Sequence, residues 1–114
     1  MIIFVFAAML GAIGRYLANF YLPRHGILVV NMLGSCIAGI ILGLTLFLGL
    51  NPIIVQAVTG GFAGALTTFS TVAVTAAEQQ INGRGSALKT WCLQVGLSTA
   101  AGLTGLFVTM LVFL

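Results

Sequence analysis

The sequence GGFAGALTTFST, residues 60–71, lies in the middle of a stretch that is otherwise apolar enough to cross a bilayer. Glycine weakens a helix, and threonine hydroxyls satisfy backbone groups that a loosened helix sets free. Hydrocarbon offers no water to such groups, so a segment of this kind is placed against protein or along a water-filled cavity. The run therefore predicts a break in a membrane-spanning helix, at a point where ions touch the protein.

The rest of the chain has the composition of an integral membrane protein. Of its 114 residues, 61% are hydrophobic and 4% are charged, whereas a soluble domain carries roughly 25% charged residues. A membrane-spanning helix needs about 20 apolar residues, and turns rich in Pro, Gly and Asn divide the chain into four such segments. They cover residues 2–22, 27–50, 53–79 and 86–114. We therefore predict an all-α membrane protein, a single four-span domain over residues 1–114 whose third helix is broken.

The few basic residues predict the orientation of the chain. Arg24, Arg84 and Lys89 flank the first and third connections, which a four-span chain places on the same side of the membrane. The second connection and both ends carry no Lys or Arg. Because cytoplasmic loops are enriched in these residues, we expect both termini to lie outside the cytoplasm.

Small and polar residues recur at helical spacing within the spans. The second span carries Asn31, Ser35, Gly39 and Gly43 at i+4, and the fourth carries Thr90, Gln94, Ser98 and Gly102. Such strips let helices approach closely and exchange hydrogen bonds, so the glycines serve either packing or function. The polar side chains of Asn31, Gln94 and Ser98 need partners, because unpaired polar groups are costly in hydrocarbon. We interpret Trp91 as a lipid-facing or gap-filling side chain.

Packing alone does not explain a charged residue such as Arg15 within the first span. Its guanidinium stays ionised, so near the bilayer interior it must face a water-filled vestibule, a partner or the headgroups. Snorkelling to the interface is the alternative. The only acid in the chain is Glu78, at the end of the third span. The spans thus offer donors and positive potential but almost no carboxylate, which suits a small anion better than an organic cation.

The glycine- and threonine-rich run adds two kinds of ion contact. Phe69 directly follows two threonines, and the edge of a phenyl ring is electrostatically positive, so an anion would lie against it. A broken helix also frees backbone carbonyls. Those around Gly64 and Thr67 suit a small hard cation.

Three motifs resemble the signatures of the bacterial fluoride channels, the Fluc or CrcB family. They are GAIGRY at residues 11–16, VNMLGS at 30–35 and GGFAGALTTFST at 60–71. Their order and the four spans match over essentially the whole chain. The resemblance implies antiparallel dimers in the bacterial cell membrane, with two fluoride pathways and passive fluoride export. It also implies a structural sodium ion on the two-fold axis that is not transported.

The resemblance assigns roles by motif position. The fluoride pathway would include Asn31, Phe69, Ser70 and Thr71. The backbone carbonyls of Gly64 and Thr67 from each subunit would hold the sodium ion. Arg15 would lie near a vestibule.

Two positions depart from the family pattern. Val72 stands where the family has a second phenylalanine, and Thr75 stands where the family tends to have a glutamate. A chain that inserts in both orientations should also have nearly balanced flanking charges, which this one lacks. We therefore expect a heterodimer with a homologous subunit of opposite orientation, in which one pathway is degraded. A homodimer is the alternative.

Other functional classes are weaker matches. A small multidrug-resistance transporter has a similar length, four spans and antiparallel dimers, but it needs a membrane-embedded carboxylate. The first span has none. We see no nucleophile and base, phosphate loop or metal-ligand cluster, so we expect neither an enzyme nor a nucleic-acid-binding protein.

Overall fold

The computed structural model describes residues 2–22, 26–68, 70–83 and 86–114. Over these residues the chain is helical and contains no strand. The elements are α1 (Ile2–Tyr21), α2 (Gly26–Leu48), α3 (Pro52–Val55), the π-helix η1 (Gln56–Ala63), α4 (Gly64–Leu66), α5 (Ser70–Asn82) and α6 (Ala87–Phe113). Four stretches are long and apolar enough to cross a membrane: Ile2–Tyr21, Gly26–Leu48, Pro52–Asn82 and Ala87–Phe113. The predicted four spans are confirmed.

Capping residues set several of the helix ends. Asn51 accepts a hydrogen bond from the Ile53 N–H at the start of α3, at 2.9 Å, and Ser86 caps α6 in a similar way. Gly49 and Gly83, directly after α2 and α5, have positive φ angles of 62° and 65°. Glycine adopts this left-handed conformation without the steric cost that a Cβ brings. Local sequence therefore determines where these turns begin.

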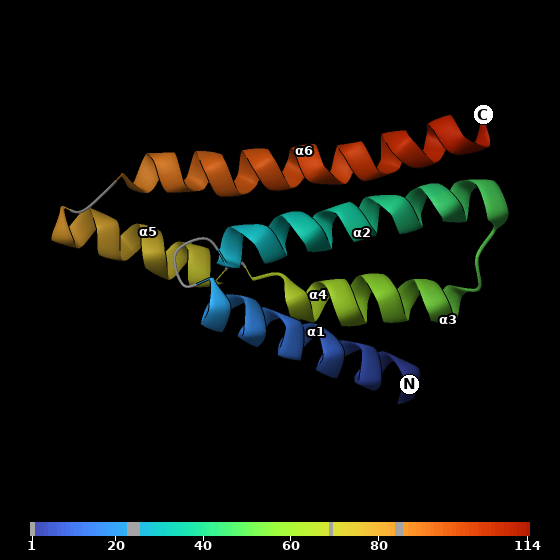
Figure 1. Cartoon of the computed structure of the whole chain (residues 1–114), viewed down its shortest axis with the longest axis horizontal. Helices are drawn as coiled ribbons and strands as arrows, with labels where there is room; N and C mark the ends of the chain where they lie inside the picture. The colour runs from blue at the N-terminus through green and yellow to red at the C-terminus, as the bar shows by residue number, and fades with distance from the viewer. Residues whose placement is uncertain (1, 23–25, 69, 84–85) are drawn as a thin grey trace.

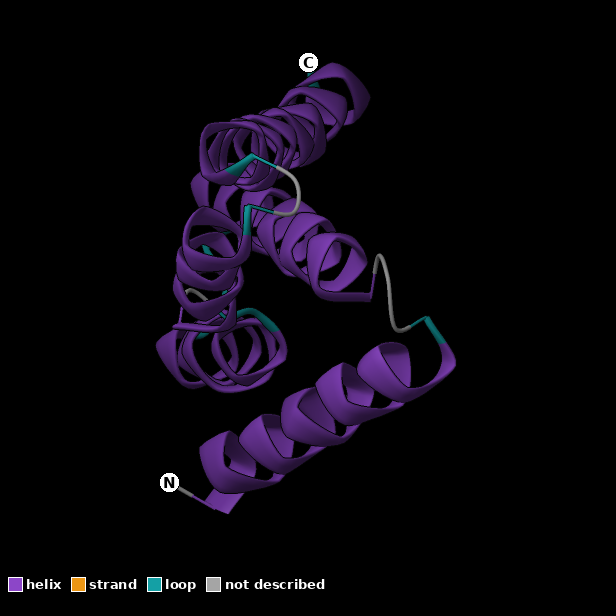
Figure 2. Ribbon diagram, turned by 90° about the vertical axis from the view of Figure 1, so that its left-hand side faces the viewer, coloured by secondary structure: helices purple, strands orange, loops and turns teal. Residues whose placement is uncertain are grey.

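The helices form a thin, elongated assembly whose extents are 49 × 32 × 20 Å. α6 packs on α2, α2 also contacts η1, and α1 packs on η1 and α4. α5 extends beyond these helices and packs on α6 (Figures 1 and 2). The first and third spans run in one direction and the second and fourth in the other, so both ends of the chain lie at the same end (Figure 1). Which side of the membrane this end faces stays a prediction.

The contact between α2 and α6 is a seam of glycines, formed by Gly39, Gly43, Gly102 and Gly105, which we call the glycine seam. A Cβ at Gly39 would collide with the carbonyl of Gly102, and one at Gly105 would collide with a carbonyl of α2. A Cβ at Gly43 would lie 2.7 Å from the Thr109 side chain. Close helix approach, the packing interpretation of these small residues, is confirmed.

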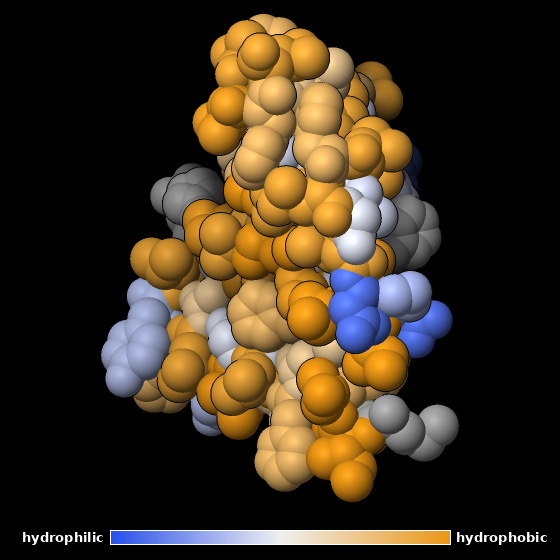
Figure 3. Space-filling model, turned by 90° about the vertical axis from the view of Figure 1, so that its right-hand side faces the viewer, coloured by the Kyte–Doolittle hydropathy of each residue, from blue (hydrophilic) through white to orange (hydrophobic). Residues whose placement is uncertain are grey.

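Much of the surface of the chain is apolar. Large hydrophobic side chains are exposed along all four spans, as lipid-facing residues are in a membrane protein. The end that carries both termini is mostly hydrophobic, with small hydrophilic areas near its margins (Figure 3). The described charged residues Arg15, Glu78 and Lys89 lie in the C-terminal halves of α1 and α5 and in the first turn of α6, and these parts of the helices point towards the opposite end (Figure 1).

Candidate functional site

The third span changes geometry twice before it reaches α5. Gln56–Ala63 form a π-helix, so the departure from α-helical geometry begins four residues before the glycine- and threonine-rich run. Within it, the Thr59 hydroxyl donates to the Val55 carbonyl at 2.5 Å. π-helical segments are rare and are frequent at functional sites.

The second change follows α4, at Leu66. Thr67 is extended, with φ −81° and ψ 158°, and α5 begins at Ser70. The Thr68 N–H, which would bond the Gly64 carbonyl in an uninterrupted α-helix, donates instead to Asn31 Oδ1 at 2.8 Å. We call Thr67 and Thr68 the interruption.

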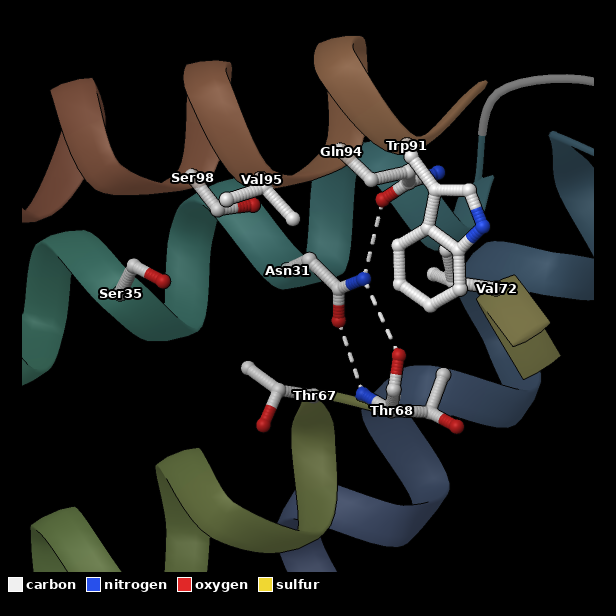
Figure 4. Close-up of a pocket in the computed structure, with 9 residues that line it drawn as sticks. All are labelled: Asn31, Ser35, Thr67, Thr68, Val72, Trp91, Gln94, Val95 and Ser98. Atoms are coloured by element: carbon white, nitrogen blue, oxygen red, sulfur yellow. Dashed lines mark hydrogen bonds between the residues drawn. The ribbon is translucent and has the colours of Figure 1, made fainter. Parts of the chain in front are cut away.

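Asn31 connects the interruption to two other helices. Its side chain is buried, 7% exposed, in α2. Because an N–H only donates, the Thr68 N–H fixes the amide oxygen of Asn31 towards the interruption. The Asn31 Nδ2 group then donates to the Thr68 carbonyl at 3.2 Å and to Gln94 Oε1 at 3.0 Å (Figure 4). One amide thus satisfies both backbone groups of Thr68 and orients a side chain of α6.

A pocket of about 230 Å³ lies beside this amide. It is lined by Asn31, Ser35, Thr67, Thr68, Val72, Trp91, Gln94, Val95 and Ser98 (Figure 4). Ser98 contributes a buried hydroxyl that has no hydrogen-bond partner among the described residues. None of the lining residues is ionisable at neutral pH, so the pocket offers dipoles rather than fixed charge. Its volume has room for several water molecules.

Arg15 approaches the interruption from the other side. Its half-buried guanidinium lies 3.5 Å from the Thr67 carbonyl, measured from Nη1. The C-terminal end of a helix carries partial negative charge, so the end of α4 attracts this cation. Gly11 and Gly14 allow the approach, since a Cβ at Gly11 would collide with the Phe62 carbonyl. Arg15 therefore has a protein partner inside the subunit, one of the options that the sequence left open.

The predicted site residues are distributed unevenly around the interruption. Asn31 and Thr67 line the pocket. Thr71 is exposed, outside the lining, and its hydroxyl accepts a hydrogen bond from the Thr68 hydroxyl at 3.2 Å. Gly64 is exposed on α4. Phe69 lies outside the described residues, and Ser70 begins α5 with its side chain outside the described part.

Sequence reasoning missed part of the pocket. It marked Gln94 and Ser98 as polar residues that need partners but did not place them in one pocket with Asn31. The interpretation of Trp91 as lipid-facing or gap-filling was incomplete, because this side chain is half-buried and lines the pocket. Residues 91, 94, 95 and 98 fall on one face of a helix, but this spacing does not say whether the face turns to lipid or to the other helices. Val72, already noted as a departure from the family, is also a pocket residue and is 4% exposed.

Within the described residues, carboxyl and thiol groups do not line the pocket. Among the described residues no three His, Cys, Asp or Glu side chains lie close enough to hold a metal ion. Glu78 is exposed on α5. A cation at the interruption would therefore depend on neutral oxygens, which include the backbone carbonyls.

Four apolar spans, three of which line an uncharged pocket with several hydrogen-bond donors, define a small helical membrane protein with a candidate ion- or solute-binding site. The sequence model of one family, described as CrcB-like protein, Camphor Resistance (CrcB), matches residues 1–110. The chain belongs to this family.

The relatives carry a more specific name. The "Fluoride-specific ion channel FluC 2" of Streptococcus pneumoniae is 35% identical over 85% of this chain and 81% of its own length. The "Fluoride-specific ion channel FluC 1" of Staphylococcus aureus strain RF122 is 45% identical over 54% of this chain. The Campylobacter jejuni channel of the same type is 40% identical over 58%. The chain spans about half the length of the staphylococcal relatives it matches.

Proposed function

We propose that the chain is one subunit of a fluoride-specific channel that lets fluoride leave the cell passively through the cytoplasmic membrane. The observation that carries this proposal is the buried Asn31 amide, which bonds the interruption and lines an uncharged pocket that also holds Gln94 and Ser98. The names of the relatives support fluoride as the ion. The relatives with these names are ion channels, which agrees with the expectation that this protein is not an enzyme.

The chemistry of the pocket suits a small, strongly hydrated anion. A pore must replace the water that such an ion loses, and N–H and O–H donors do this. Asn31 and Gln94 supply amide N–H groups, and Ser98 supplies a hydroxyl. Carboxylates, which would repel an anion, are missing from the lining. Phe69, Ser70 and Thr71 stay predicted members of the same pathway.

The Asn31–Gln94 hydrogen bond defines the state of the pathway before an anion enters it. In that state the Asn31 amide donates to Gln94 Oε1. An arriving anion takes the place of this oxygen, and the Gln94 side chain turns its NH₂ group towards the ion. Both amides then donate to the anion, which makes Gln94 an additional pathway residue.

The exposure of Gly64, at the start of α4, supports a dimer. The chain has a radius of gyration of 15.3 Å, above the roughly 13 Å of a compact domain of this length. An antiparallel partner placed against the interruption would cover Gly64 and close the pocket. We infer a heterodimer with a homologous subunit, because the aliphatic Val72 lies in the pocket and the flanking charges favour one orientation.

We also propose a sodium site next to the interruption. We place the ion at the carbonyls of Gly64 and Thr67, at the negative end of the first half of the third span. A hard cation needs several oxygen ligands, so two carbonyls from one subunit require two more from the partner. Sodium bound there would offset the repulsion between anions in neighbouring pathways. Arg15 contacts the same Thr67 carbonyl, so the guanidinium must move partly away from this oxygen when the ion binds.

A proton-coupled drug transporter is not favoured. That mechanism needs an acid within the membrane that alternates between protonated and ionised forms. Glu78 is exposed near the end of α5 and does not line the pocket.

Fluoride efflux from loaded liposomes, followed with a fluoride-selective electrode, tests the proposal. Asn31→Asp should lower efflux by at least tenfold, because it places a negative charge where the anion passes. Asn51→Asp is the matched control: it makes the same chemical change in the α2–α3 turn and keeps a capping oxygen. Equal efflux in the two variants would remove Asn31 from the pathway.

The same assay tests the assembly. Co-reconstitution with a CrcB-type subunit of opposite orientation should raise efflux well above that of the chain alone. Robust efflux from the chain alone would discard the obligate heterodimer in favour of a homodimer.

A further inference from the structure

Trp91 forms one wall of the pocket. It lies in the second turn of α6, on the same face as Gln94 and Ser98, and is half-buried. In Figure 4 the indole extends from α6 past Gln94, with its six-membered ring directed towards Asn31 and Thr68 and its nitrogen directed away. The part of the ring that faces the hydrogen-bonded amides is thus a C–H edge.

Val72 lines the same pocket as this ring. It is 4% exposed and comes from α5. A valine fills space but brings no ring quadrupole. Among the described lining residues, Trp91 is the only aromatic side chain.

The orientation of the ring has an electrostatic consequence. The edge of an aromatic ring is positive and its face is negative. An anion held by the N–H groups of Asn31 and Gln94 would therefore meet an attractive edge. The α5–α6 contact holds the helix in this rotation, because the Thr90 hydroxyl, next to Trp91 in sequence, donates to the Gln79 side chain.

We propose that Trp91 is a specificity-determining residue of this subunit, whose ring edge contacts the anion in the pocket and performs the role that the aliphatic Val72 does not. The inference rests on the proposed function, since it concerns the anion that passes Asn31. It assigns an ion contact to α6, in addition to those of the second and third spans.

The first test compares three variants in the liposome assay, with fluoride and chloride efflux measured side by side. Trp91→Leu keeps an apolar side chain but removes the ring, and should lower fluoride efflux about three- to tenfold, as expected for the loss of one aromatic contact. Trp91→Phe retains a ring edge and should lose less. Leu93→Ala, on an exposed part of α6 outside the lining, should behave as the unaltered chain does.

A rescue variant separates ion contact from packing. Val72→Phe in the Trp91→Leu background places a ring on the α5 side, in the space that the smaller leucine leaves, and should restore fluoride efflux and the fluoride-to-chloride ratio. Restoration supports the proposal. Efflux in Trp91→Leu equal to that of the unaltered chain overturns it, as does an equal loss in Trp91→Phe and Trp91→Leu without rescue.

Fluorescence of the unaltered protein provides a second test. The chain has one tryptophan, so tryptophan emission measured on this chain without a partner reports on Trp91 alone. Sodium fluoride should change the emission in a saturable way, and sodium chloride at the same concentration should not. If the unaltered chain, with and without partner, neither conducts fluoride nor responds in fluorescence, the channel proposal fails too. If it conducts but fluorescence is silent and Trp91→Leu has no effect, only the role of Trp91 is lost.

Discussion

The two halves of α2 make contrasting contacts. In its second half, Gly39 and Gly43 bring the helix so close to α6 that no Cβ fits at these positions. In its first half, Asn31 holds the interruption and Gln94 through hydrogen bonds. One helix thus combines a dry seam, which depends on shape, with a polar pocket, which depends on donors and acceptors. Substitutions in the seam should affect folding, and substitutions in the pocket should affect ion passage.

The largest effect is expected in the glycine seam. Gly39→Leu should destabilise the subunit by about 3 kcal/mol or more, because a side chain there overlaps the backbone of α6. Gly96→Leu is the matched control, since nothing lies within 4 Å of a Cβ at that position. Thermal unfolding in detergent, followed by helical circular dichroism, measures the difference. Equal melting temperatures would contradict the account of the seam.

Removal of the Asn31 amide should lower both the stability of the subunit and its fluoride efflux. Asn31→Leu leaves the N–H and carbonyl of Thr68 and the amide of Gln94 without this partner, which costs about 1–3 kcal/mol for a buried group. Fluoride efflux should fall at least tenfold. Gln94→Leu leaves the bonds between Asn31 and Thr68 in place and should therefore be milder in stability. A variant Asn31→Leu that conducts normally would show that the amide serves packing alone.

Removal of sodium should affect the site at the Gly64 and Thr67 carbonyls and leave the packing of the glycine seam unchanged. Replacing sodium with a large organic cation during purification should weaken activity or dimer assembly, because the carbonyls of Gly64 and Thr67 lose their ion. Size-exclusion chromatography and efflux measure the two effects separately. Unchanged behaviour in both would argue that the guanidinium of Arg15 alone satisfies this end of the helix.

The smallest effect is expected for Ser98. Ser98→Ala removes a buried hydroxyl without a described partner, so stability should change by less than about 1 kcal/mol. Fluoride efflux should decrease about twofold, because the pathway loses one donor among several. Calorimetry and efflux on the same preparation test this. A clear destabilisation would mean that the hydroxyl has a structural partner.

Hydropathy and turn residues were sufficient to predict the four spans, because each connection carries its own Pro, Gly or Asn. The i+4 spacing of glycines likewise indicated the close approach of α2. Three features were beyond reach of such patterns. The π-helix begins at Gln56, Arg15 reaches the Thr67 carbonyl, and Trp91 turns into the pocket. The last two depend on how helices rotate against one another, and periodicity within a single helix does not contain that information.

Ion selectivity of the unaltered protein tests the central claim most directly. Liposomes that contain this chain, alone and with a CrcB-type subunit of opposite orientation, are loaded with fluoride or chloride, and efflux is recorded with ion-selective electrodes. A donor-lined pocket at the interruption predicts rapid fluoride loss and retained chloride in at least one of the two preparations. Fluoride efflux no faster than from protein-free liposomes in both, or equal passage of both halides, would contradict it.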